Sequence, residues 1–167
     1  MGSLAGFNTG GTHNTVLVDV DNATGFTITV AAAATPQVVT DALFTEKKNS
    51  TNGGITVSGG VATVATPAGF GRYLVSATAS DALGILSTFH FVQVYAKEAG
   101  VTAAAKGAKS LRTEGAAAVR GSTGCAVAIV DLSAIGDTVE MRLGVQTNGN
   151  AILIRSASLQ MIKIGEV

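Results

Sequence analysis

The stretch CAVAIVDLSAIGDTVEMRLGV, residues 125–145, decides the fold class of this chain. Cys125–Leu132 is an apolar run of residues that favour β-strands, and Gly136-Asp137 is a turn-forming pair. After the turn, Val139, Met141, Leu143 and Val145 alternate with Glu140, Arg142, Gly144 and Gln146. A period of two places one set on a core and the other in solvent or against a partner, and no helical period fits it. The stretch therefore predicts a hairpin at the centre of an all-β, antiparallel two-sheet sandwich.

Runs with strand character continue on both sides of this hairpin, separated by residues that favour turns. Gly59-Gly60 and Asn148-Gly149-Asn150 each predict a tight turn between strands. Glu46–Gly54 is polar and is expected to be a loop, and the Ala- and Gly-rich residues 101–124 are expected to form a short strand or helical turn followed by a long loop. The other expected strands are Pro36–Phe44, Ile55–Ser58, Val61–Thr66, Arg72–Ser80, Leu86–Lys97, Val139–Gln146, Ala151–Ser156 and Leu159–Ile164.

The two long strands in the middle of the chain carry bulk on both faces. In Arg72–Ser80, Tyr73, Val75 and Ala77 point one way. In Leu86–Lys97, one face holds Phe89, Phe91, Gln93 and Tyr95, and the opposite face holds His90, Val92, Val94 and Ala96. This pattern is expected where one face fills the sandwich and the other meets a neighbouring subunit.

Residues 1–35 are expected to form a separate N-terminal arm or β-hairpin in front of a domain at 36–167. Residues 1–14 are rich in Gly, Asn and Thr, which indicates an arm that is flexible or ordered by a partner. Val16–Val20 and Gly25–Ala31 read as two strands around a turn-rich loop. Thr35-Pro36 would stop any helix that begins in the alanine run before it.

The composition excludes several classes of function. The 167 residues hold 11 basic and 11 acidic side chains, so the net charge is zero and no positive stripe predicts nucleic-acid binding. No apolar run reaches the length of a membrane span, and the start of the chain does not resemble a signal peptide. A single cysteine excludes an internal disulfide. Because only 13% of the residues are charged, we expect part of the surface to be covered by partners or by further copies.

Candidate chemical groups are few, and each has a plainer structural interpretation. His13 and His90 are the two histidines, and no converging ligands accompany either of them. Cys125 begins an apolar strand and is expected to be a buried small hydrophobe rather than a nucleophile. Asp19, Asp21 and Asn22 fail the spacing of a calcium loop and favour a turn. We therefore expect no enzymatic activity, no cofactor and no metal site.

Two short patterns match the acceptor site for N-glycosylation, Asn22-Ala-Thr24 and Asn49-Ser-Thr51. Without a secretion signal, both are interpreted as polar loops. Gly59-Gly60 and Gly69-Phe70-Gly71 lie between strands, which is not the strand-to-helix setting of a phosphate-binding loop.

Four segments in order resemble the trimeric jelly-rolls of the tumour necrosis factor and complement globular-head type. They are VATVATPAGFGRYLVS (61–76), FHFVQVYAKEAG (89–100), LSAIGDTVEMRL (132–143) and SLQMIKI (158–164). The resemblance covers about residues 36 to 167, whereas 1–35 has no match and 101–124 is longer and richer in Ala and Gly than the family's loops. It implies a jelly-roll at 36–167 and assembly into a homotrimer, an architecture that bacteriophages use for capsid decoration and fibre heads.

These observations lead to a hypothesis of a virion structural protein: a trimeric decoration (cement) protein on a bacteriophage capsid, made in the host cytoplasm. Its partners would be two further copies and the major capsid protein shell, with no nucleic acid and no membrane. Candidate residues at the trimer interface are Tyr73, Phe89, Phe91, Tyr95 and Met161, and candidates for anchoring to the shell are Phe7, Val16, Val18 and Phe26. The alternative is a receptor-binding or adhesin head of a tail fibre or appendage, and a third hypothesis is a secreted cytokine-like ligand.

Overall fold

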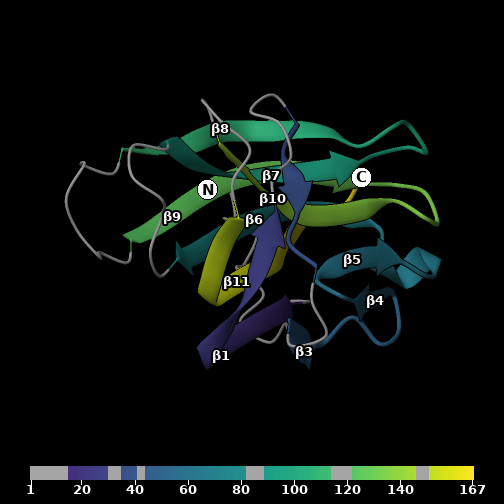
Figure 1. Cartoon of the computed structure of the whole chain (residues 1–167). Coiled ribbons are helices and arrows are strands. Elements are labelled where there is room, and N and C mark those ends of the chain that lie inside the picture. Colours follow the sequence, from purple (N-terminus) through teal and green to yellow (C-terminus); the bar gives the residue numbers. More distant parts are fainter. Residues whose placement is uncertain (1–14, 30–34, 41–43, 82–88, 114–121, 146–150) are drawn as a thin grey trace, which may run out of the picture.

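The computed structural model describes residues 15–29, 35–40, 44–81, 89–113, 122–145 and 151–167 and consists of two packed antiparallel β-sheets (Figure 1). Within these residues the only helical element is the short 3₁₀ turn η1, Pro67–Gly69. The predicted all-β sandwich is confirmed. The strands are β1 Thr15–Thr29, β2 Gln37–Val38, β3 Thr45–Asn49, β4 Ile55–Ser58, β5 Val61–Val64, β6 Gly71–Asp81, β7 Phe89–Lys97, β8 Ala104–Thr113, β9 Ser122–Leu132, β10 Thr138–Val145 and β11 Ala151–Gly165.

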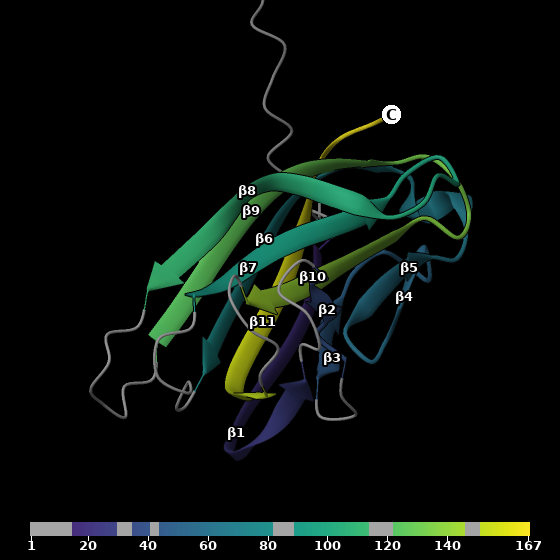
Figure 2. The same cartoon turned by 45° about the horizontal axis from the view of Figure 1, so that its top comes forward.

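The two sheets divide the strands in a jelly-roll order. One sheet has the order β3-β1-β11-β6-β9, and the other has the order β4-β5-β10-β7-β8 with β2 paired to β10 (Figure 2). The predicted hairpin over 125–145 is wrong, although both of its strands and its turn exist. β9 pairs with β6 and β10 pairs with β7, so the turn carries the chain from one sheet to the other. Alternation within a strand reports which face is buried and not which strand lies beside it.

Small and β-branched side chains fill the space between the sheets. Alternating residues of β6 point inward, because Tyr73, Val75 and Ala77 are fully buried, as the sequence predicted. On β7 the inward residues are Val92, Val94 and Ala96, as the sequence predicted, whereas the side chains of Phe89 and His90 lie outside the described ones. The face of β7 with Phe91 and Tyr95 therefore points away from the core.

The later part of the predicted arm, Thr15–Thr29, belongs to the sandwich. Thr15–Thr29 is one strand whose two parts both pair with β11, with a break in register between Asp21 and Phe26. The hairpin expected from Val16–Val20 and Gly25–Ala31 is therefore wrong, because the turn-forming residues between them form an irregularity within β1. Residues 1–14 lie outside the described residues, so an arm in that part of the chain stays a prediction.

Three further segments differ from the expectation. The polar loop Glu46–Gly54 begins with edge strand β3, and the strand expected at Pro36–Phe44 is reduced to the two residues of β2. The segment 101–124 contains the long strand β8, whose ladder with β7 outweighs the helix propensity of alanine. The two strands expected after residue 150 are the single strand β11, paired on both sides along its length. The turn at 148–150 lies outside the described residues.

Candidate functional site

An exposed apolar group lies on the outward face of the five-stranded sheet. Leu74 of β6 stands opposite Ile129 of β9 and opposite Ile162 of β11, so the three side chains share one face. Ile129 is 58% exposed, and Val127, two residues before it, is 52% exposed. Ile164 near the end of β11 is also half exposed. We call the outward side of β6, β9 and β11 the apolar face.

The remainder of this face carries small uncharged polar residues. Successive pairs across β11, β6 and β9 bring Gln160, Ser76, Ser158, Thr78 and Thr123 to the same side. At one border of this face, Arg72 and Asp131 form an ion pair with the guanidinium Nε 2.7 Å from Oδ1. The hydrogen bond from Arg72 holds the pKa of the Asp131 carboxyl below its usual range. Because none of these residues carries an unpaired charge, another protein can cover them without burying an unpaired ion.

The carboxylate of Asp137 organises the loops at one end of the sandwich. The residue is fully buried, and its two oxygens accept hydrogen bonds from the backbone N–H groups of Ala99, Gly100, Ser133 and Ala134 at 2.9–3.0 Å. Burial by itself would raise the pKa of Asp137, but these four donors outweigh it and the pKa is lowered. We call the end with these loops the Asp137 end.

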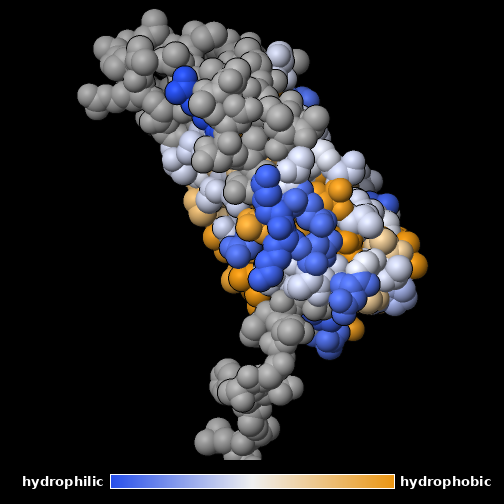
Figure 3. Space-filling view, turned by 90° about the horizontal axis from the view of Figure 1, so that it is seen from below, coloured by the Kyte–Doolittle hydropathy of each residue, from blue (hydrophilic) through white to orange (hydrophobic). Residues whose placement is uncertain are grey.

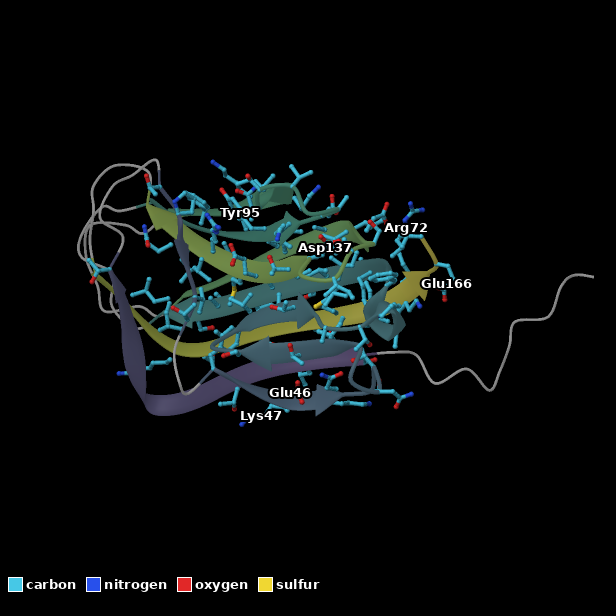
Figure 4. The ribbon with its side chains drawn as sticks, turned by 90° about the vertical axis from the view of Figure 1, so that its right-hand side faces the viewer. Glu46, Lys47, Arg72, Tyr95, Asp137 and Glu166 are labelled. Atoms are coloured by element: carbon cyan, nitrogen blue, oxygen red, sulfur yellow. The ribbon has the colours of Figure 1, made fainter. Side chains whose placement is uncertain are left out.

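A second carboxylate joins the two sheets at the same end. Glu98, directly after β7, accepts a hydrogen bond from the N–H of Asp131 in β9 at 2.9 Å and forms an ion pair with Lys106 of β8. Arg72 and Glu166 also lie at this end (Figure 4), where Glu166 pairs with Lys163. Hydrogen bonds to the carboxylates of Asp137 and Glu98 therefore hold the loops at the Asp137 end together.

The free edge of the five-stranded sheet carries charge. β3 exposes Glu46, Lys47 and Lys48, and hydrophilic residues gather at the centre of the view from the side where β1 and β3 lie (Figure 3). Charged side chains on an edge strand oppose pairing with the strand of another chain. The exposed apolar residues on the apolar face are a better candidate for association than this edge.

The residues predicted to form the trimer interface differ in how much of each side chain is exposed in the structure. Tyr73 and Met161 are fully buried inside the single chain and offer a neighbour no surface. Phe91 is almost buried on the outward side of β7, where its ring lies against Gly144 and beneath the ammonium of Lys109. Tyr95 is partly exposed, with the Arg142 guanidinium 4.3 Å from its ring centroid. The apolar face was missed because β9 was assigned to a hairpin rather than to the edge of the other sheet.

Of the predicted anchoring residues, Val16 is fully buried in the core, so its side chain offers a partner no surface. The side chains of Phe7, Val18, Phe26 and Phe89, both histidines, and Asp19, Asp21 and Asn22 lie outside the described ones. The interface and anchoring roles of the remaining candidates stay predictions.

Cys125 is exposed, which corrects the expectation of a buried cysteine. It stands opposite Thr78 on the outward side of β9, because the inward positions of that strand are the alternate residues Ala126 and Ala128. At the second glycosylation pattern, the Asn49 amide nitrogen donates to the carbonyl of Ile55 at 2.7 Å, and Thr51 is buried. A glycan on Asn49 would disrupt this hydrogen bond and the turn around it. The Asn49-Ser-Thr51 pattern is therefore explained by the structural role of Asn49.

Within the described part of the chain, no group of three or more His, Cys, Asp or Glu side chains is arranged to hold a metal ion. A helix long and apolar enough to cross a membrane is likewise not found among these residues.

Comparison with known proteins identifies the fold. No protein-family model matches the chain, and no curated protein sequence matches it. Among solved structures, Eiger TNF from S. frugiperda is similar with a TM-score of 0.62 and 12% identity, over 93% of this chain and 94% of that chain. The globular domain of zebrafish complement 1qA protein has a TM-score of 0.59 and 14% identity, over 92% and 99% of the two chains. PRD1 vertex protein P5 has a TM-score of 0.55 and 14% identity, over 93% and 100%. The chain has the jelly-roll fold of the tumour necrosis factor and complement globular-head type.

Proposed function

We propose that this protein is a non-enzymatic virion structural protein that assembles as a homotrimer and decorates the capsid surface of a bacteriophage. The fold it shares with the vertex protein P5 of the phage PRD1 supports a place on a virion. The observation that carries the proposal is the apolar face, which combines exposed Leu74, Val127 and Ile129 with uncharged polar residues. Surfaces of this kind mark contacts with other proteins.

The contact between copies is proposed to use the apolar face. Each half-exposed aliphatic side chain contributes about 1 kcal/mol when a neighbour covers it, and a closed ring covers the face on every copy. Leu74 and Ile129 stand directly opposite each other in the ladder, so one neighbouring side chain can cover both. This face replaces the face of Phe91 and Tyr95 as the proposed centre of the trimer, because cations lie over both of those rings.

Sedimentation equilibrium of the purified chain tests the trimer. We expect a mass of three chains for the unchanged protein. Ile129→Asp places a carboxylate on the apolar face and is expected to raise the dissociation constant at least about a hundredfold, or about 2.7 kcal/mol. Thr56→Asp on the exposed side of β4 is the matched control, and we expect it to leave the mass unchanged. A monomer at all concentrations contradicts the proposal.

Binding to capsids tests the role on the virion. Capsids produced without this protein are incubated with the purified chain and pelleted, and we expect the trimer to co-sediment. Removal of residues 1–14, which stops short of β1, is expected to leave the trimer intact and to weaken this binding if an arm anchors the protein. Binding to host cells without binding to capsids supports instead the receptor-binding head of a fibre.

A further inference from the structure

Two exposed apolar side chains lie on loops that the Asp137 carboxylate holds together. Val101 is 66% exposed and Ile135 is 63% exposed. The N–H of Gly100, directly before Val101, donates to one carboxylate oxygen at 2.9 Å, and the N–H of Ala134, directly before Ile135, donates to the other at 2.9 Å. One buried group therefore fixes the backbone immediately before both side chains.

A third loop reaches the same place through the backbone of Asp137. The N–H of Val64 donates to the carbonyl of Asp137, and the N–H of Gly136 donates to the carbonyl of Val64, each at 2.9 Å. This pair of bonds ties the end of β5 and the exposed, uncharged residues Thr66–Ala68 that follow it to the turn with Ile135. Loops that are already fixed lose little conformational entropy when a partner binds, so their apolar side chains contribute more to affinity.

The first and last described residues of the chain also lie at the Asp137 end. Thr15 pairs with Ile162 near the end of β11, and Gly71 pairs with Leu132 just before the loop that Asp137 organises. Thr15, the first described residue, therefore lies at the Asp137 end, and Val167 at the end of the chain is half exposed. A partner at this end would contact the loops close to the start of β1.

We propose that Val101 and Ile135 form a docking surface for an apolar patch on another protein, which under the proposed function is the virion shell. This inference rests on the proposed function and adds which end of the trimer faces the shell. In a ring whose axis runs along the strands, the Asp137 ends of all copies point the same way, so three weak docking sites act together. The ion pairs Arg72–Asp131 and Lys163–Glu166 provide the polar surroundings typical of such an interface.

The test uses full-length trimer and capsids produced without this protein. The double variant Val101→Asp with Ile135→Asp is expected to remain trimeric in sedimentation and to bind capsids at least about tenfold more weakly, because it places a charge at each contact. The matched control is Ser58→Asp at the exposed last residue of β4, next to the turn between β4 and β5 and outside the loops that Asp137 organises, which is expected to bind normally.

The outcomes separate the two proposals. If the unchanged protein does not bind capsids, the proposed function fails. If the unchanged protein binds and the double variant binds equally well, only the docking surface is refuted. Loss of the trimer in the double variant, confirmed with Ile135→Ser, assigns these residues to contacts between copies and overturns the inference. So does binding to uncharged phosphatidylcholine vesicles that depends on Ile135, because the occupant is then a lipid surface.

Discussion

Gly107 of β8 lies so close to Val127 of β9 that a Cβ atom at Gly107 would stand 2.3 Å from the Val127 carbonyl oxygen. β8 is an edge of one sheet and β9 an edge of the other, so this contact closes one side of the sandwich. Gly107 has a φ of +66° at a break in the register between β7 and β8, and its carbonyl accepts a hydrogen bond from the Gln93 amide at 3.3 Å. The position requires glycine both for its backbone conformation and for the approach of the sheets.

Gly107→Ala is expected to lower the free energy of unfolding by about 2–4 kcal/mol, because the methyl group must displace backbone and the residue keeps a left-handed conformation. Urea denaturation followed by circular dichroism measures the change. Gly53→Ala is the matched control, since Gly53 has a φ of +77° and open space around its Cβ position. It should cost about 1 kcal/mol from the backbone conformation alone, and equal losses in the two variants would show that the contact with Val127 contributes nothing.

Asp137→Asn is expected to lower the free energy of unfolding at pH 7 by about 2–4 kcal/mol, because the amide keeps one acceptor and turns an N–H₂ group toward backbone donors. Since the folded pKa of Asp137 lies below its ordinary value of 3.8, the stabilisation is complete above that value and is lost as the pH falls through the folded pKa. Denaturation curves at several pH values check this. The variant should lack this acid-dependent part, whereas Glu166→Gln at an 82% exposed side chain should keep it.

The alternation of single strands could be predicted from the sequence, but their neighbours could not. Tyr73, Val75 and Ala77 read as one face and are one buried face, because a period of two is a local property. The partner of β9 depends on the path of the whole chain. The turn predicted at Gly136-Asp137 is therefore correct, but the hairpin predicted around it is wrong. The turn connects a strand of one sheet to a strand of the other.

The candidate site was less predictable for a related reason. Val127 and Ile129 alternate with Ala126 and Ala128, so the sequence shows apolar residues on both sides of β9 and no polar face that marks solvent. Large apolar residues are usually expected in the core, but in β9 Val127 and Ile129 point outward and the two alanines point inward. The role of Asp137 was hidden because its four donors come from two loops, and the Ala99–Gly100 loop lies 37–38 residues away in the sequence.

Tyr73→Phe is expected to lower the free energy of unfolding by about 1 kcal/mol at neutral pH, because the buried hydroxyl donates to the Gly69 carbonyl at 3.0 Å. Burial, with a smaller effect of the Glu166 charge, raises the pKa of Tyr73 to about 12 from 10.0. The hydroxyl therefore stabilises the fold fully below pH 10.0 and loses that contribution as the pH rises toward 12. Thermal unfolding between pH 8 and 11 should show a smaller alkaline loss in the variant, and identical slopes would contradict this assignment.

Cys125 is a native reactive probe of the apolar face, so no cysteine has to be introduced. Its thiol is exposed in the single chain and lies on the outward side of β9, two residues before Val127. We expect a small maleimide to react several-fold more slowly at protein concentrations where the trimer forms, because a neighbouring copy covers this strand. Ile129→Asp should react at one fast rate over the same concentrations, since its face stays uncovered. A rate in the unchanged protein that does not depend on concentration, measured while sedimentation shows a trimer, would place the contact between copies on another surface.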